Sequence, residues 1–101
     1  MKKALSNDKP IAPVDRVFSA LGDPVRLEII RILMEKKEAP CGDCGLPVGK
    51  STLSHHYKVL REIGFIKTRG EGTRQINCLQ IEEINRRFPG LLEWIGRPQG
   101  P

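Results

Sequence analysis

The chain has 101 residues, of which 39% are hydrophobic and 29% are charged, and its formal net charge is +5 at pH 7. This composition is typical of one folded domain with a single modest core, and it excludes a disordered chain. No apolar run approaches the roughly 20 residues of a membrane-spanning helix, and no apolar signal segment follows Lys2 and Lys3. We therefore expect a cytoplasmic protein with no membrane partner.

The positive charge is concentrated in one part of the chain. Between Leu46 and Arg74 there are six lysines and arginines but only two glutamates, so this window carries +4 of the total charge of +5. A local cationic patch on an otherwise balanced protein predicts a polyanionic partner. The alternative is a basic surface that only keeps the protein soluble.

The first part of the chain predicts a short arm followed by two helices. Residues 1–13 are polar, contain two prolines and lack periodicity, so we expect a flexible arm. The apolar residues of Val14–Leu21 recur at helical spacing, which predicts a short amphipathic helix ending at Gly22. Asp23 and Pro24 suit the cap and the first position of a second helix. That second helix is apolar on most of its circumference, so we expect it in the middle of the core.

The segment from Pro40 to Val48 is interrupted by Gly and Pro and predicts irregular structure. It contains Cys41 and Cys44 at a Cys-x-x-Cys spacing. In a reducing compartment, two such thiols form a reversible disulfide, bind a thiophilic metal ion, or are inert small residues in a tight turn. The pair supplies only two of the four ligands that zinc prefers, so no cofactor is certain. The third cysteine, Cys78, is expected to be a buried core thiol.

The stretch from Lys50 to Gly64 predicts an amphipathic helix. Ser51 can cap its first turn, and Gly64 can close its last turn in a left-handed conformation. One face collects apolar residues at positions i, i+4, i+7 and i+10, namely Leu53, Tyr57, Leu60 and Ile63. The opposite face carries side chains that can meet a phosphate or a base edge, namely Thr52, His55, His56, Lys58 and Arg61. A short helix with one buried side and one cationic side suits the major groove of DNA.

After this helix the chain predicts a β-hairpin. Two β-prone runs, Phe65–Arg69 and Thr73–Leu79, flank the Gly-containing turn Gly70–Gly72. Arg69 and Arg74 stand beside the tip of this hairpin. A hairpin with arginines at its tip can follow a phosphate backbone or enter a minor groove.

The C-terminal part predicts a helix over Ile81–Phe88, then a further apolar stretch and a loose tail at residues 97–101. A domain of this size has limited room in its core for all the apolar side chains of its two ends. Some of them are therefore expected to form a subunit interface, where aromatic anchors are favoured. The expected interface residues are Val14, Val17, Phe18, Phe88, Leu91, Leu92, Trp94 and Ile95.

Two separate stretches carry motif information: FSALGDPVRLEIIRIL at Phe18–Leu33 and STLSHHYKVLREIGFI at Ser51–Ile66. They resemble the opening motif and the recognition-helix motif of the ArsR/SmtB family of bacterial repressors. The run Arg69–Gly72 is similar to the wing tip of that family, and the similarity covers about Val14–Leu79. This resemblance implies a winged helix-turn-helix homodimer joined through its first and last helices. It also implies a roughly palindromic operator, with two recognition helices in successive major grooves about 34 Å apart, and an inducer that lowers DNA affinity.

The chain departs from this family at its sensing sites. Arsenic-type sensors carry a Cys-x-Cys pair within a regular helix, whereas Cys41 and Cys44 have a different spacing and lie in a segment broken by Gly and Pro. Zinc sensors of the family carry ligands on the last helix, but the stretch Ile81–Ile95 contains no His, Asp or Cys. That zinc site is therefore excluded, and the family's effector does not carry over.

The combined interpretation is a mainly α-helical protein with a two-stranded β wing, a winged helix-turn-helix over residues 14–96. We expect a transcriptional repressor that binds a palindromic operator in double-stranded DNA as a homodimer and is released by thiol oxidation or soft-metal binding at Cys41 and Cys44. The alternative is a winged-helix module that binds protein or RNA and has no sensing function. An enzyme is not expected, because apart from the thiols no convergent ionisable groups are visible in the sequence. A nucleotidase or kinase is rejected because Cys44 stands where a phosphate-binding loop ending at Lys50-Ser51 requires Gly. The expected DNA contacts are Lys50, Ser51, Thr52, Ser54, His55, His56, Lys58, Arg69 and Arg74.

Overall fold

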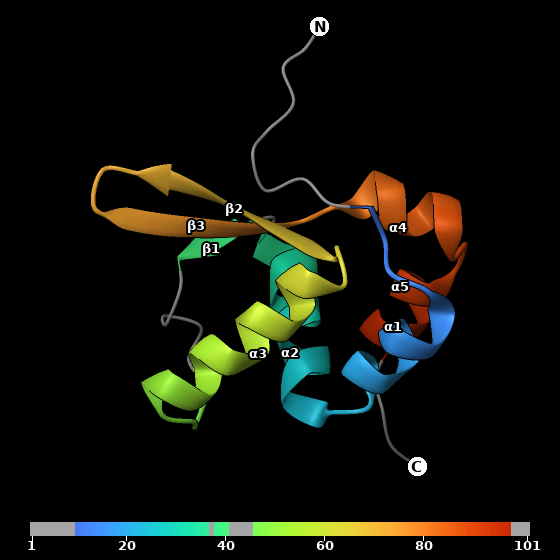
Figure 1. Cartoon of the computed structure of the whole chain (residues 1–101), viewed down its shortest axis with the longest axis horizontal. Coiled ribbons are helices and arrows are strands. Elements are labelled where there is room, and N and C mark those ends of the chain that lie inside the picture. The colour runs from blue at the N-terminus through green and yellow to red at the C-terminus, as the bar shows by residue number, and fades with distance from the viewer. Residues whose placement is uncertain (1–9, 37, 41–45, 98–101) are drawn as a thin grey trace, which may run out of the picture.

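A computed structural model describes residues 10–36, 38–40 and 46–97 of the chain. In chain order, its elements are α1 (Val14–Leu21), α2 (Pro24–Lys36), β1 (Glu38–Pro40), α3 (Lys50–Glu62), β2 (Ile66–Glu71), β3 (Arg74–Leu79), α4 (Ile81–Arg87) and α5 (Leu91–Gly96). The β2–β3 hairpin extends to one side of the molecule, and α1, α4 and α5 gather at the opposite side (Figure 1). The predicted class, mainly α-helical with a β wing, is confirmed.

Helix α2 lies in the middle of the molecule, as its apolar circumference predicts. It contacts α1, α3 and α5 as well as strands β1 and β3. Ile29, Ile30 and Leu33 on this helix are fully buried. Helix α2 is therefore the element against which both the hairpin and the other helices are positioned.

The start of α2 is capped as the sequence predicts. The side chain of Asp23 accepts hydrogen bonds at its Oδ1 from the backbone N–H groups of Val25 and Arg26, at 2.8 and 3.2 Å. Pro24 occupies the first helical position, where its missing N–H costs no hydrogen bond. The break between α1 and α2 at Gly22 and Asp23 is therefore a local property of the sequence.

The N-terminal segment before α1 is packed on the domain. Ile11 and Ala12 are buried in the core, and the backbone N–H of Ala12 donates to the carbonyl oxygen of Ile63 at 3.0 Å. The prediction of a flexible arm reaching residue 13 is therefore wrong for this segment. Its two apolar side chains are removed from water, which outweighs the low helix and strand propensity of the flanking prolines. Residues 1–9 lie outside the described part of the chain.

The predicted hairpin is confirmed, with a shifted turn. Strands β2 and β3 pair antiparallel from Ile66 opposite Leu79 to Glu71 opposite Arg74. The turn therefore begins at Gly72, which has φ +64°. A third strand, β1, pairs with the other edge of β3 and gives the order β1-β3-β2. The sequence does not predict β1, because three residues ending in proline carry no alternating pattern.

The C-terminal part forms two short helices. Helix α4 ends at Arg87. Gly90, with φ +88°, is the N-cap residue of α5, which begins at Leu91. The predicted helix over Ile81–Phe88 is therefore observed one residue shorter, and the apolar stretch after it forms a helix of its own. None of the helices in the described ranges is long and apolar enough to cross a membrane.

Candidate nucleic-acid interface

Helix α3 separates an apolar stripe from a polar surface. The four apolar residues expected to face the core, Leu53, Tyr57, Leu60 and Ile63, are all buried. Six of the residues expected to contact DNA are exposed, namely Lys50, Ser51, Thr52, Ser54, His55 and Lys58, and Arg61 is half-buried. The helix therefore presents a hydrogen-bonding surface with positive charge at Lys50 and Lys58.

Helix α3 begins at Lys50, and its N-cap lies two residues before the predicted cap, Ser51. Gly49 is the N-cap residue, with extended backbone (φ −69°, ψ 162°), and no side chain of a described residue caps it. Ser51 lies inside the first turn and is exposed, so its predicted role as the cap is wrong. The first backbone N–H groups of a helix carry partial positive charge, so this end of α3 favours an anion.

His56 is not on the exposed surface of α3. It is 7% exposed, so the prediction that it faces DNA is wrong. The Nε of Arg26 donates a hydrogen bond to the Nδ1 of His56 at 3.0 Å, and the Nη1 of Arg26 donates to the carbonyl oxygen of Ala20 at 2.8 Å. The sequence holds a signal for this burial, because His56 follows Leu53 by three residues and precedes Leu60 by four. No pattern in the sequence predicts that Arg26 contacts His56.

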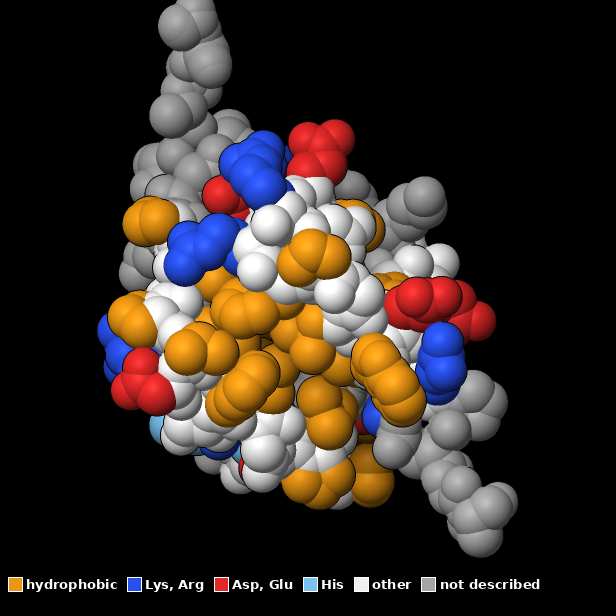
Figure 2. All heavy atoms as spheres, turned by 90° about the vertical axis from the view of Figure 1, so that its right-hand side faces the viewer, with side chains coloured by type: hydrophobic (Ala, Val, Ile, Leu, Met, Phe, Trp, Pro, Cys, Tyr) orange, Lys and Arg blue, Asp and Glu red, His pale blue; other side chains and the backbone are white. Residues whose placement is uncertain are grey.

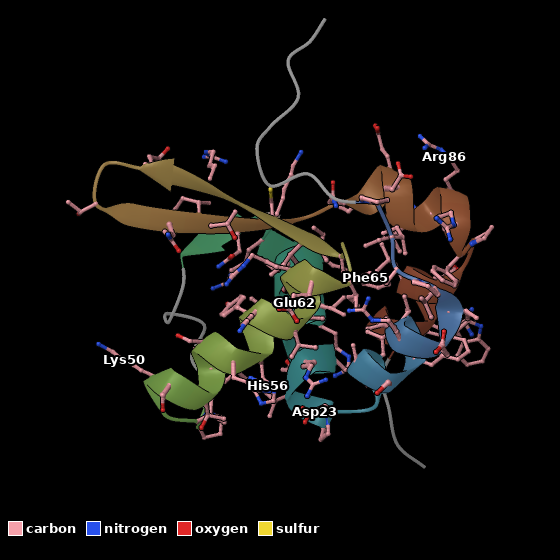
Figure 3. All side chains as sticks on the ribbon, in the orientation of Figure 1. Asp23, Lys50, His56, Glu62, Phe65 and Arg86 are labelled. Carbon is pink, nitrogen blue, oxygen red and sulfur yellow. The ribbon has the colours of Figure 1, made fainter. Side chains whose placement is uncertain are left out.

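Asp23 lies near this pair at the start of α2 (Figure 3). Burial works to raise the pKa of Asp23, but hydrogen bonds from the N–H groups of Arg26 and Val25 and the charges of His56 and Arg26 act in the opposite direction. The net result is a pKa of Asp23 below its ordinary value. The carboxylate therefore stays charged while it caps α2.

The hairpin carries one of its two predicted contact residues within the described side chains. Arg69 is exposed on β2, and its guanidinium lies 3.4 Å from the carboxylate of Glu71. The backbone of Arg74 lies opposite that of Glu71 in the register of the hairpin. The side chain of Arg74 is outside the described part of the structure. The hairpin is tied internally by a hydrogen bond of 2.8 Å between the hydroxyl of Thr68 and the Oδ1 of buried Asn77.

The exposed end of α3 and the tip of the hairpin project toward the same side of the molecule (Figure 1). Figure 3 shows Lys50 at that side and Arg86, on α4, at the opposite side. Residues far apart in the sequence are therefore brought into one surface, as a contact surface for a long polyanion requires. We call the exposed residues of α3 together with Arg69 the α3–wing surface.

The opposite side of the molecule is apolar. Figure 2 shows hydrophobic side chains gathered over this side. Val14 and Phe18 on α1 are 51% and 60% exposed, and Trp94 on α5 is 65% exposed. The guanidinium of Arg97 stands over the Trp94 ring, 4.7 Å from its centroid. We call Val14, Phe18 and Trp94 the α1–α5 patch.

Only part of the predicted interface set belongs to this exposed patch. Val17, Leu92 and Ile95 are buried within the chain's own core, so their assignment to a subunit interface is wrong. Phe88 and Leu91 are partly buried and pack against that core. This division between core and surface follows helical geometry. Val17 and Leu21 face inward on α1, whereas Phe18, the residue after Val17, faces outward.

Of the three cysteines, Cys41 and Cys44 lie outside the described residues. Cys78 on β3 is half-buried, whereas the sequence predicts a buried core thiol. Among the residues that the structure describes, no three His, Cys, Asp or Glu side chains gather as metal ligands.

Comparison with known proteins agrees with this arrangement. The family profile "Bacterial regulatory protein, arsR family" matches residues 23–68. The chain is 38% identical over 83 residues to an uncharacterized HTH-type transcriptional regulator, YceK, of Bacillus subtilis, covering 79% of this chain and 83% of that protein. It is 32% identical over 87 residues to a homolog of the cadmium resistance transcriptional regulatory protein CadC of Staphylococcus aureus, covering 84% of this chain and 71% of that protein.

A solved structure shares the fold. Reduced HlyU from Vibrio cholerae N16961 superposes with a TM-score of 0.59 at 26% sequence identity, covering 74% of this chain and 87% of that chain. The matched profile begins at Asp23, which caps α2, and ends at Thr68 on β2, so it spans α2, α3 and the first half of β2. The chain therefore belongs to the ArsR family of bacterial transcriptional regulators, which are DNA-binding proteins and not enzymes.

Proposed function

We propose that this regulator is a repressor that binds a palindromic operator in double-stranded DNA as a homodimer. The observation that carries the proposal is the division of α3 into a buried apolar stripe and an exposed polar surface. A 13-residue helix is about 20 Å long, and the major groove, about 12 Å wide, admits one helix. In this arrangement α3 enters the groove with its N-terminal half foremost.

The contacts divide by chemistry into two groups. Base edges and adjacent phosphates are read by short polar side chains and one imidazole, those of Ser51, Thr52, Ser54 and His55. The phosphate backbone is held by long cations, those of Lys50, Lys58, Arg69 and Arg74. Phosphate contacts fix the register of the protein on the duplex, and base contacts give the sequence preference. His56 is left out of both groups because it is buried.

The homodimer is proposed to form through the α1–α5 patch. Exposed aromatic rings such as Phe18 and Trp94 are favoured at interface centres and are unusual as a group on a monomer surface. Helices α1 and α5, which carry the patch, lie on the side opposite the hairpin tip (Figure 1), so a second copy seated there leaves the α3–wing surface free. Two copies of α3 would then meet two half-sites of one operator.

A sensing role is proposed for Cys41 and Cys44. Cys41 directly follows the last residue of β1, and Cys44 lies in the connection to α3. A disulfide or a soft-metal ion held by these thiols would restrict the connection between the wing sheet and the recognition helix, and would lower DNA affinity. Support comes from a relative that is named for cadmium resistance, since cadmium is a soft ion that suits thiolate ligands.

One titration tests both parts of the proposal. The protein first selects duplexes from a random-sequence DNA library, and its affinity for the selected duplex is then measured reduced, after hydrogen peroxide, and with Cd²⁺ or Zn²⁺. We expect a palindromic consensus, and an affinity that falls on oxidation or metal addition in the wild type but not in a Cys41→Ser/Cys44→Ser variant. Cys78→Ser is the matched control and should respond as the wild type does.

The outcomes separate the two claims. An affinity unchanged by every treatment would remove the cysteine switch while leaving DNA binding in place. Failure to select any duplex, even at low salt, would overturn the repressor and would favour a winged-helix module for protein or RNA.

A further inference from the structure

We propose that Arg26 and His56 form a positioning pair that holds the recognition helix in place only while the His56 imidazole is neutral. The inference rests on the proposed DNA-binding role of α3, because it concerns how that helix is oriented. The two residues are 30 positions apart in the sequence and meet across the α2–α3 contact. Neither is on the α3–wing surface, so the pair acts on DNA affinity through the helix.

The hydrogen bond between them specifies a protonation state. An arginine guanidinium can only donate, so the Nδ1 of His56 must accept with a free lone pair. The bond of 3.0 Å from the Arg26 Nε to that atom therefore requires the proton of a neutral imidazole to sit on Nε2. Protonation of Nδ1 would remove the acceptor and leave two cations facing one another.

Arg26 connects three helices through one guanidinium. Its backbone belongs to the first turn of α2, its Nη1 donates to the carbonyl oxygen of Ala20 near the end of α1, and its Nε donates to His56 on α3. Helix α1 carries part of the α1–α5 patch. The same side chain therefore connects the helix of the proposed dimer interface to the helix that meets DNA.

A positive charge on His56 would be unfavourable in its surroundings. His56 is almost fully buried between the apolar residues of α3, where an added charge is poorly solvated. The charged and titratable groups that face it are Arg26 and Asp23 from the start of α2 and His55 from its own helix, whose ring centroid is 5.9 Å away. Asp23 accepts at its Oδ1 from two backbone N–H groups. Arg26 is in direct contact, so a cationic His56 would face a second cation.

The sign of the pH effect follows from this arrangement. The hydrogen bond from Arg26 can form only while Nδ1 of His56 is free to accept, so a proton added at that atom opposes the positioned helix and lowers the affinity that depends on it. His55 has the opposite effect. It is exposed on the α3–wing surface, so its protonation adds a cation facing the phosphates and strengthens binding. Two adjacent histidines are therefore expected to move DNA affinity in opposite directions.

The test compares pH profiles of DNA affinity between single variants. In His56→Asn the amide oxygen lies close to the place of Nδ1 and can still accept from Arg26, but it does not titrate. Affinity for the duplex selected by the wild type is measured from about pH 8 to about pH 5.5, which spans the ordinary histidine range. We expect the wild type to lose about tenfold in affinity relative to His56→Asn over this interval, the scale of one hydrogen bond to a charged group.

His55→Gln is the matched control on the same helix. This variant should lose affinity at low pH as the wild type does, and the loss should be larger, because the cation that His55 supplies on protonation is absent. Thermal unfolding of each variant at each pH confirms that the folded protein is measured. Wild-type and His56→Asn profiles that run parallel would overturn the proposal.

A second measurement does not involve DNA. Long-range proton–nitrogen NMR correlations of the free protein at neutral pH should show His56 with its proton on Nε2 and Nδ1 unprotonated, and Arg26→Lys should abolish the hydrogen-bond shift at Nδ1. A proton on Nδ1 at neutral pH would overturn the positioning pair whatever the DNA result. If the wild type selects no duplex, the proposed function is wrong. The NMR measurement still shows whether His56 accepts a hydrogen bond from Arg26.

Discussion

The carbonyl oxygen of Pro10 lies against Gly64 so closely that a Cβ added at residue 64 would stand 2.6 Å from it. Gly64 also has φ +86°, a conformation that L side chains rarely adopt. The segment that precedes α1 is thus seated on the last turn of the recognition helix, where the N–H of Ala12 donates to Ile63. The glycine serves both the end of α3 and the approach of that segment.

Gly64→Ala is therefore expected to destabilise the protein by about 2–4 kcal/mol, from backbone strain together with the clash. Urea unfolding followed by circular dichroism measures this. Gly70→Ala is the control, because a Cβ there has nothing within 4 Å. Equal stability of the two variants would show that the Pro10 segment does not hold its place on α3 in solution.

Asp23→Ala should remove the cap of α2 and cost about 0.5–2 kcal/mol near neutral pH. The pKa of Asp23 lies below its ordinary value in the folded protein. Its charge therefore contributes stability that is present above the pKa of the unfolded chain and is lost as the pH falls through the folded pKa. Unfolding free energies of wild type and variant should converge at acidic pH. Asp15→Ala, on α1, removes an exposed carboxylate that makes no such cap, and it should cost less stability than Asp23→Ala near neutral pH.

The sequence predicts the elements well and their tertiary contacts less well. Apolar spacing suffices for α2 and α3, because these helices repeat their buried residues over several turns. It fails at His56, because the apolar pattern runs through Leu53, Tyr57 and Leu60 at intervals of four and three. This pattern predicts that a polar residue between them lies on the outside. Burial of His56 depends on a partner from another helix, Arg26, and no local pattern encodes that contact.

For the proposed interface, too, the sequence predicts the apolar residues but not which of them are buried in the fold. An excess of apolar residues at both ends of the chain is visible in the sequence, but the division between core and surface depends on how α1 and α5 rest on α2. Val17 and Ile95 are inside, whereas Phe18 and Trp94 are outside. Strand β1 likewise forms because β3 offers it an open edge, which is a property of the folded sheet.

Phe18→Ser is expected to shift the protein from the proposed dimer to a monomer with little loss of monomer stability, because most of this ring is already exposed in the single chain. Sedimentation velocity across a concentration series measures the shift. Val17→Ala, one residue away, should instead lower stability by about 1–3 kcal/mol, since Val17 is fully buried. A Phe18→Ser variant that sediments as the wild type does would place the subunit interface elsewhere.

Glu71→Gln should strengthen binding to DNA by about two- to fivefold, because the variant removes a negative charge from the wing tip, 3.4 Å from the guanidinium of Arg69. Exposed ion pairs contribute about 0–1 kcal/mol, which sets this scale. Glu93→Gln, an equal change of charge on α5, controls for net charge alone. The same gain in both variants would mean that the wing tip is not near the phosphates.

The most direct test of the central claim is the salt dependence of DNA affinity. Lys50→Ala on α3 and Arg86→Ala on α4 remove equal charges from opposite sides of the molecule (Figure 3). In a plot of log affinity against log salt concentration, Lys50→Ala should flatten the slope by about one unit per protomer, because one phosphate contact is lost. Arg86→Ala should leave the slope as in the wild type. If the two variants change the slope equally, or if only Arg86→Ala does, the α3–wing surface is not where this protein meets DNA.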